Sequence, residues 1–155
     1  EVHNKAEIHL QKSKQKHLAT LEDKNPNHKF IKMNGRKIYN YALSNVPRAI
    51  KSCIDKSNLD LSNISKILIH QANEKMDLAI GERLFSLYGI DKMPAEKMPM
   101  NIAKMGNNSV ATVPVLFDMI MKNQLKSHSL SPSDVIIMAS VGAGMSINAF
   151  SYRLP

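Results

Sequence analysis

The chain has 155 residues, 43% of them apolar, and its 21 basic and 13 acidic side chains give a formal charge of +8. This length suits one domain with a sizeable core, and the absence of an apolar run of about 18 residues excludes a transmembrane helix. The charge favours an acidic or phosphate-bearing partner. Nucleic acid is not expected, because the basic residues are scattered, aromatic residues make up only 5% of the chain, and no nucleic-acid-binding module is visible.

Cys53 is the only cysteine. An intrachain disulfide is therefore impossible, and we expect a reducing, cytoplasmic compartment. Cys53 falls on the apolar stripe of a predicted helix, where a free thiol is usually packed. The polar segment 1–16 lacks the apolar centre of a signal peptide.

The first third of the chain changes from polar to periodic. Residues 1–28 are polar, and their only periodicity is that of a short amphipathic helix over 6–19. Residues 29–33 alternate, which predicts a short strand. From 37 to 56 apolar residues recur at helical spacing, interrupted by Pro47. Either the helix kinks there or a second helix begins, since proline has no N–H to donate.

The rest of the chain alternates strands and helices. The patterns predict a strand at 66–70, a helix at 75–88 stopped by Gly89, a proline-rich loop at 92–100, a helix from 109 to about 124, and strands at 135–141 and 146–153. The run at 135–141 is apolar throughout, which suits a central strand covered on both faces. This order of elements predicts a layered α/β domain.

Three short motifs lie at predicted strand ends and in the loops beyond them, where the active sites of open α/β sheets are usually found. Each has a simple structural explanation. The histidine can bond a nearby carbonyl, the second motif can be a turn and helix cap, and the third can be a tight hairpin or bulge. Their order and placement together favour a site. The motifs are His70-Gln71-Ala72-Asn73, Gly106-Asn107-Asn108-Ser109 and Gly142-Ala143-Gly144.

With these motifs the chain resembles the C-terminal half of the β-ketoacyl-acyl-carrier-protein synthase III family, condensing enzymes of the thiolase-like superfamily. The resemblance runs from about Phe30 to Pro155, while residues 1–28 match nothing that we can place. It implies an α/β fold, one thiolase-like half with a mixed β-sheet and helices on both faces. We expect 1–28 to be a polar N-terminal segment and 29–155 to be the domain. The segments that carry the resemblance are 33–54, 69–73, 106–114 and 134–145.

The resemblance also implies an activity, decarboxylative condensation of malonyl-acyl carrier protein with an acyl thioester in fatty-acid or related lipid or polyketide synthesis. His70 and Asn107 are then the catalytic pair, whose N–H groups stabilise the enolate charge that forms on the malonyl thioester. The backbone of Gly142, Ala143 and Gly144 resembles a turn that completes a second oxyanion hole. No metal or cofactor is implied beyond the substrates acyl-CoA and malonyl-acyl carrier protein. The residues placed to contact acyl carrier protein are Gln71, Ala72, Asn73, Glu74 and Lys75.

The chain departs from the family pattern in several places. Lys75 stands where the family usually has arginine, and it loses that residue's bidentate geometry. Ala143 sits in a turn that is commonly all glycine, and 147–148 replace an aromatic-glycine pair. The family's nucleophilic cysteine belongs to its N-terminal half, and Cys53 lies in the wrong context to replace it. We therefore expect no condensation by the chain alone.

The expected partners are acyl carrier protein, the missing N-terminal half and, for the full-length enzyme, a second copy in a homodimer. The alternative is a non-catalytic module that docks acyl carrier protein or pairs with a separate subunit, and a basic nucleic-acid binder is a third interpretation. A lone half should leave an apolar helix face open, so we expect self-association or covering by 1–28. The candidate residues of that face are Met76, Ala79, Ile80, Val113, Leu116 and Ile120.

Overall fold

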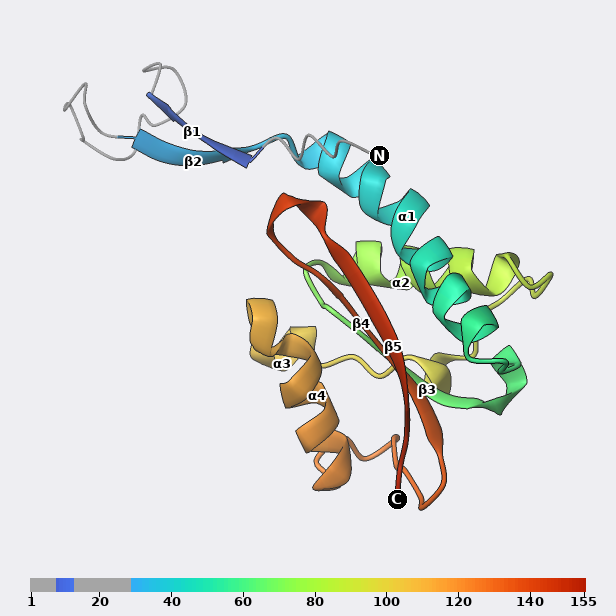
Figure 1. Ribbon diagram of the computed structural model, residues 1–155. Coiled ribbons are helices and arrows are strands. Elements are labelled where there is room, and N and C mark those ends of the chain that lie inside the picture. Colours follow the sequence, from blue (N-terminus) through green and yellow to red (C-terminus); the bar gives the residue numbers. More distant parts are fainter. Residues whose placement is uncertain (1–7, 13–28) are drawn as a thin grey trace.

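The computed structural model describes residues 8–12 and 29–155, which form helices and strands in close alternation. The domain from residue 35 onward packs helices on both faces of one sheet (Figure 1). In chain order the elements are β1 (Ile8–Lys12), β2 (Lys29–Met33), α1 (Gly35–Lys56), β3 (Ile64–Ile69), α2 (Glu74–Ser86), α3 (Ile102–Met105), α4 (Thr112–Met121), β4 (Val135–Val141) and β5 (Ile147–Arg153).

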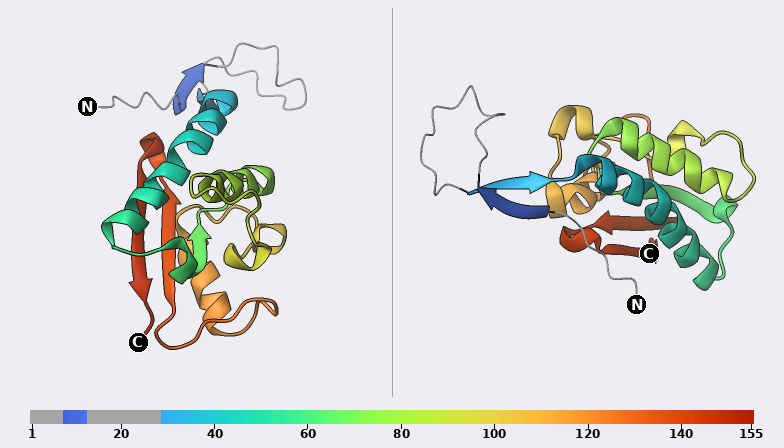
Figure 2. Two further views of the ribbon diagram at one scale, coloured as in Figure 1. Left: turned by 90° about the vertical axis from the view of Figure 1, so that its right-hand side faces the viewer. Right: turned by 90° about the horizontal axis from the view of Figure 1, so that it is seen from above.

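The sheet of the domain has three strands in the order β3-β4-β5. β4 pairs in parallel with β3 and antiparallel with β5, so Met138 lies between Leu68 and Phe150. α1 and α2 cover one face, and α4 covers the other (Figure 2). This arrangement confirms the expected mixed sheet with helices on both faces. It also explains the continuous apolarity of β4, which is the central strand.

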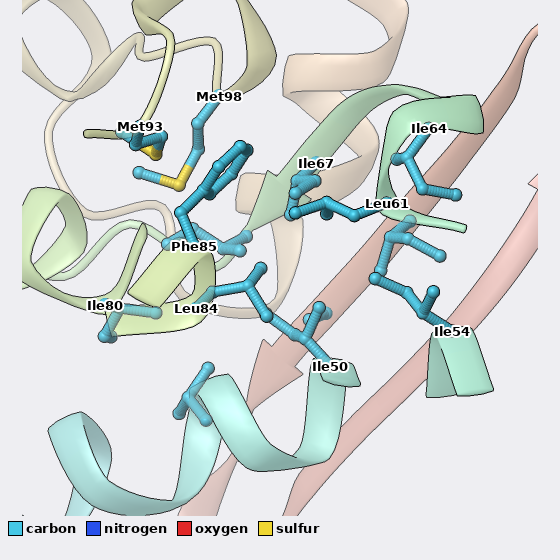
Figure 3. Close-up of a cluster of buried hydrophobic side chains, with 14 of the residues drawn as sticks. Ile50, Ile54, Leu61, Ile64, Ile67, Ile80, Leu84, Phe85, Met93 and Met98 are labelled. Carbon is cyan, nitrogen blue, oxygen red and sulfur yellow. The ribbon is translucent and has the colours of Figure 1, made fainter. Parts of the chain in front are cut away.

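The larger core lies between the sheet and the pair α1 and α2 (Figure 3). Val46, Ile50 and Ile54 recur every four residues on α1, and each is at most 2% exposed. Burying each such side chain contributes about 1.5–3 kcal/mol. Pro47 lies inside α1, which has 22 residues in all and continues without a break past the proline. Of the two alternatives considered at Pro47, a second helix is therefore wrong.

The smaller core lies under α4 and corrects one expectation. Leu116 and Ile120 were expected to face a missing partner, but they are 0% and 1% exposed and pack on this chain's own sheet. Ile80 of α2 is likewise 3% exposed. Periodicity reveals an apolar stripe but not the surface that the stripe covers, and here the nearest sheet covers it. Met76, Ala79 and Val113 are partly buried against the two cores.

The N-terminal strands form a separate antiparallel pair, in which Ile8 lies opposite Met33. The strand expected at 29–33 is confirmed. The helix expected over 6–19 is wrong at 8–12, which is a strand, and its other residues lie outside the described part of the chain. None of the described helices is long and apolar enough to cross a membrane.

Candidate active site

His70 directly follows β3, at the end of the sheet where the strand stops. Its backbone N–H donates to the carbonyl of Ala139 at 2.9 Å, which extends the β3–β4 pairing by one residue. Its ring Nδ1 lies 3.1 Å from the carbonyl oxygen of Ser109, 39 residues later. A carbonyl oxygen can only accept, so Nδ1 carries the hydrogen of this bond. The simple expectation that this histidine bonds a carbonyl is therefore correct.

The turn at 106–109 is built around Ser109. Gly106 has φ +66° and ends α3, and Ser109 has φ +52°, which is uncommon for a residue with a side chain. The side-chain Oδ1 of Asn107 accepts the Ser109 backbone N–H at 2.9 Å. The hydroxyl of Thr112 donates to the Ser109 carbonyl, also at 2.9 Å. The motif is thus a turn before a helix, as its composition predicts.

Ser109 joins the two predicted catalytic side chains. Its carbonyl contacts the ring of His70, and its N–H contacts the amide of Asn107. His70 is half-buried and Asn107 is exposed. The two side chains therefore meet at one residue, as expected from the motifs, although their convergence on a substrate stays a prediction.

The protonation of His70 follows from its surroundings. Burial lowers the pKa of the ring below its usual value, and the Ser109 carbonyl offsets part of that effect. The neutral ring is therefore favoured at neutral pH. Since Nδ1 holds its hydrogen against Ser109, Nε2 of the neutral ring has a lone pair and accepts. Nε2 can donate only when the ring gains a second proton.

The glycine turn after β4 closes the hairpin to β5. Gly142 donates its N–H to the carbonyl of Ser146 at 2.8 Å, and Gly144 has φ +72°, a conformation that suits glycine. The N–H of Gly142 is therefore already used. Any oxyanion role of this turn falls to the backbone of Ala143 and Gly144.

Gln71 does not fit the docking surface on which the sequence placed it. It is 0% exposed, and its side chain bonds only to backbone groups of a distant loop. Its Nε2 donates to the Pro99 carbonyl at 2.9 Å, and its Oε1 accepts from the N–H groups of Asn101 and Ile102 at 2.9 and 3.0 Å. Gln71 thus fixes the loop before α3, and it offers no surface to a partner.

The other residues of the predicted docking segment lie at the start of α2. Asn73 caps the helix, and its side chain accepts from the N–H of Met76 at 3.2 Å. Asn73, Glu74 and Lys75 are exposed, and Ala72 is partly exposed. These residues are therefore placed where a partner can reach them.

An apolar groove of about 320 Å³, which the sequence did not predict, borders the site. Its lining includes Val110 just before α4, Phe117 in the middle of α4, and Ala139 and Phe150 on the sheet. Val110 follows Ser109 directly, and Ala139 holds the backbone of His70. Val110 is 89% exposed and Phe150 is 54% exposed, so part of the exposed apolar surface lies here. Alternation along β5 was the available signal, because it leaves Phe150 on the α4 side.

Cys53 is not placed as a nucleophile of this site. It lies on α1, which covers the opposite face of the sheet from α4, and it is partly buried against the larger core. Burial raises the pKa of its thiol, which reduces the reactive thiolate. Across residues 8–12 and 29–155, no group of three histidine, cysteine or carboxylate side chains could hold a metal ion.

Comparison with known proteins places the chain in a family. Residues 54–154 match the family model described as 3-oxoacyl-[acyl-carrier-protein (ACP)] synthase III C terminal. A β-ketoacyl-[acyl-carrier-protein] synthase III from Acaryochloris marina is 36% identical over 123 residues, which cover 79% of this chain and 34% of that protein. A relative from Pyropia yezoensis is 30% identical, over 79% of this chain and 35% of its own length.

Solved structures agree with the sequence matches. A β-ketoacyl-[acyl carrier protein] synthase III from Thermus thermophilus has a TM-score of 0.71 at 25% identity, over 87% of this chain and 39% of that one. A 3-oxoacyl-(acyl-carrier protein) synthase from Burkholderia xenovorans has a TM-score of 0.68 at 28% identity, over 85% of this chain and 34% of that one. The chain thus spans about a third of the length of these relatives. It belongs to the 3-oxoacyl-[acyl-carrier-protein] synthase III family of thiolase-like condensing enzymes and contains the family's C-terminal domain.

Proposed function

We propose that this chain is the C-terminal catalytic part of an enzyme that condenses malonyl-acyl carrier protein with an acyl thioester, with loss of CO₂. The observation that carries the proposal is the arrangement at Ser109, which holds His70 and Asn107 together at the end of β3. In this proposal both side chains bind the carbonyl oxygen of the malonyl thioester. The acyl group is held as a thioester on a cysteine that this chain does not supply.

The proposed role of Asn107 follows from the orientation of its amide. Because Oδ1 accepts the Ser109 N–H, the amide is fixed, and its Nδ2 group is left to donate. When CO₂ leaves, the electron pair of the broken bond forms an enolate, whose charge rests on the thioester oxygen. An N–H group already aimed at that oxygen stabilises the charge as it develops.

The proposed role of His70 needs a second proton on its ring. With Nδ1 donating to Ser109, Nε2 becomes a donor only in the imidazolium form. A bound malonyl group brings negative charge close to the ring, which raises the pKa of His70 against the lowering effect of burial. Substrate binding thus favours the doubly protonated ring, whose Nε2–H then donates to the enolate oxygen.

The other candidate residues are assigned proposed roles from where they lie in the fold. The backbone of Ala143 and Gly144 is proposed to stabilise the second oxyanion, on the acyl thioester. The exposed start of α2, with Asn73, Glu74 and Lys75, is proposed to dock acyl carrier protein. The charge of +8 suits such an acidic partner. The apolar groove is proposed to contact the part of the enzyme that carries the nucleophile.

A second candidate is a non-catalytic module that binds acyl carrier protein. The raised pKa and packed position of Cys53 favour it, because they leave this chain without a nucleophile. The two candidates differ at the site. Only a catalytic domain needs His70 and Asn107 to bind the malonyl thioester, whereas a docking module needs only the start of α2.

The test measures by NMR how tightly the purified chain binds a non-hydrolysable malonyl thioester analogue. His70→Ala and Asn107→Ala should each weaken binding by about tenfold or more, since each removes a hydrogen bond to the analogue. Asn108→Ala is the matched control and should leave the affinity unchanged. With acyl-CoA and malonyl-acyl carrier protein, the chain alone should form no β-ketoacyl product. Equal binding by all variants would contradict the catalytic assignment.

A further inference from the structure

The geometry points to Thr112 as a positioning residue of this site, which acts by holding the Ser109 peptide that orients both His70 and Asn107. This inference rests on the proposed function for the meaning of the site. Thr112 itself touches neither ring nor amide in the contacts described above. Its hydroxyl reaches the shared carbonyl of Ser109.

The backbone at Ser109 needs to be held. A residue with a side chain at φ +52° is strained, because the left-handed region brings its Cβ close to backbone oxygen. Three side chains hold this residue in the structure. Asn107 binds its N–H, while Thr112 and His70 bind its carbonyl. Two of the three are the proposed catalytic groups. Thr112 is therefore the one contact that can hold Ser109 while His70 and Asn107 change their contacts with substrate.

Thr112 is suited to be a fixed support. It is the first residue of α4 and is 0% exposed, so water does not compete for its hydroxyl. A buried hydroxyl keeps its hydrogen-bond partner, because losing that partner in the interior is costly. The Ser109 carbonyl is thereby tied to α4, and α4 is packed on the sheet through Leu116. The position of the Ser109 carbonyl is thus fixed by the packing of α4 on the core.

The consequence at His70 is a defined tautomer. As long as the Ser109 carbonyl stays in place, the neutral ring carries its hydrogen on Nδ1. If the carbonyl turns away, Nδ1 loses its partner, and hydrogen on Nε2 becomes competitive. A merely structural threonine would affect stability but would leave the tautomer unchanged.

The test is the ¹⁵N NMR spectrum of the His70 ring in the full 155-residue chain at a pH where the ring is neutral. His70→Gln identifies the signal. In the wild-type chain, Nδ1 should carry the hydrogen in about nine of ten rings or more. In Thr112→Val, which keeps the shape but loses the hydroxyl, this fraction should fall to about half or less. Thr112→Ser, which keeps the hydroxyl, should restore it.

Ser109 provides a second pair of variants that avoids the buried core, because its side chain is exposed. Ser109→Gly tolerates positive φ and should keep the wild-type tautomer, whereas Ser109→Val disfavours positive φ and should lose it. If Thr112→Val does not fold, this pair decides. A wild-type tautomer in Thr112→Val, or in Ser109→Val where the first variant is unfolded, would overturn the inference. The readout needs no substrate, so a failure of the proposed function would appear separately, in the binding assay.

Discussion

Asp77 should make the stability of this domain depend on pH in an unusual direction. It lies in the first turns of α2 and is 0% exposed, and neither carboxylate oxygen has a hydrogen-bond partner among the described residues. Burial raises the pKa of Asp77 to about 7, with a further contribution from the charge of Glu74, while the nearby backbone N–H groups of Ala72 and Asn73 oppose it. Substitution with asparagine removes the ionisable group while keeping the size of the side chain.

The magnitude follows from the difference between the two states. The ordinary value is 3.8, so the folded pKa is higher by about 3 pH units, which corresponds to about 4 kcal/mol at most. Between pH 4 and pH 7 the folded state binds more protons than the unfolded state, so the free energy of unfolding falls as pH rises. Above the folded pKa the whole penalty is present, and below about pH 4 it vanishes.

The assay is urea unfolding of the wild-type chain and Asp77→Asn at several pH values between 4.5 and 8. The free energy of unfolding of the variant, relative to wild type, should increase by about 3 kcal/mol across this range, because about 1 kcal/mol of the penalty is already present at pH 4.5. Any constant effect of the amide cancels in the comparison between pH values. Asp118→Asn is the control, because the exposed pair of Asp118 and Lys122 contributes less than about 1 kcal/mol. A difference between wild type and Asp77→Asn that does not change with pH would refute the reasoning.

Two further predictions concern packing. Gln71→Leu should lower the free energy of unfolding by on the order of 3 kcal/mol in urea unfolding, because it leaves buried backbone groups of the loop before α3 without partners; an unchanged stability would show that water replaces these bonds. Leu116→Ala should cost about 2–5 kcal/mol, since the side chain is 0% exposed. Val110→Ala, at a position 89% exposed just before α4, should change the stability of the chain by less than about 0.5 kcal/mol, and equal losses in the two variants would contradict the burial assigned to these two positions.

Sequence patterns were sufficient for the elements that depend on local chemistry. The apolar run at 135–141 became the central strand β4. The strand expected at 66–70 became β3 (Ile64–Ile69), with His70 one residue beyond its end. Gly89, with φ +73°, lies just beyond α2 as expected of a glycine that ends a helix. These features are decided within a few residues of the chain, so they can be predicted from the sequence alone.

Features that depend on distant contacts could not be predicted in the same way. Gln71 reads as a polar residue beside a site, and its burial depends on a loop about 30 residues later. Leu116 and Ile120 form an apolar stripe, but only the folded sheet shows what the stripe covers. The role of Ser109 also depends on a distant residue, because its carbonyl meets the ring of His70. Each of these contacts joins segments whose proximity is a property of the fold.

The most direct test of the central claim is CO₂ release from malonyl-acyl carrier protein in a chimera. In this chimera, the part of the Acaryochloris marina synthase that is 36% identical to this chain, about a third of its length, is replaced by the corresponding residues of this chain. The folded chimera should release CO₂, and His70→Ala and Asn107→Ala should each lower the rate by about 100-fold, as expected for loss of one oxyanion donor. The matched variant Asn108→Ala should stay within a few-fold of the unsubstituted chimera. If His70→Ala and Asn107→Ala release CO₂ as fast as Asn108→Ala, the site does not perform the proposed chemistry.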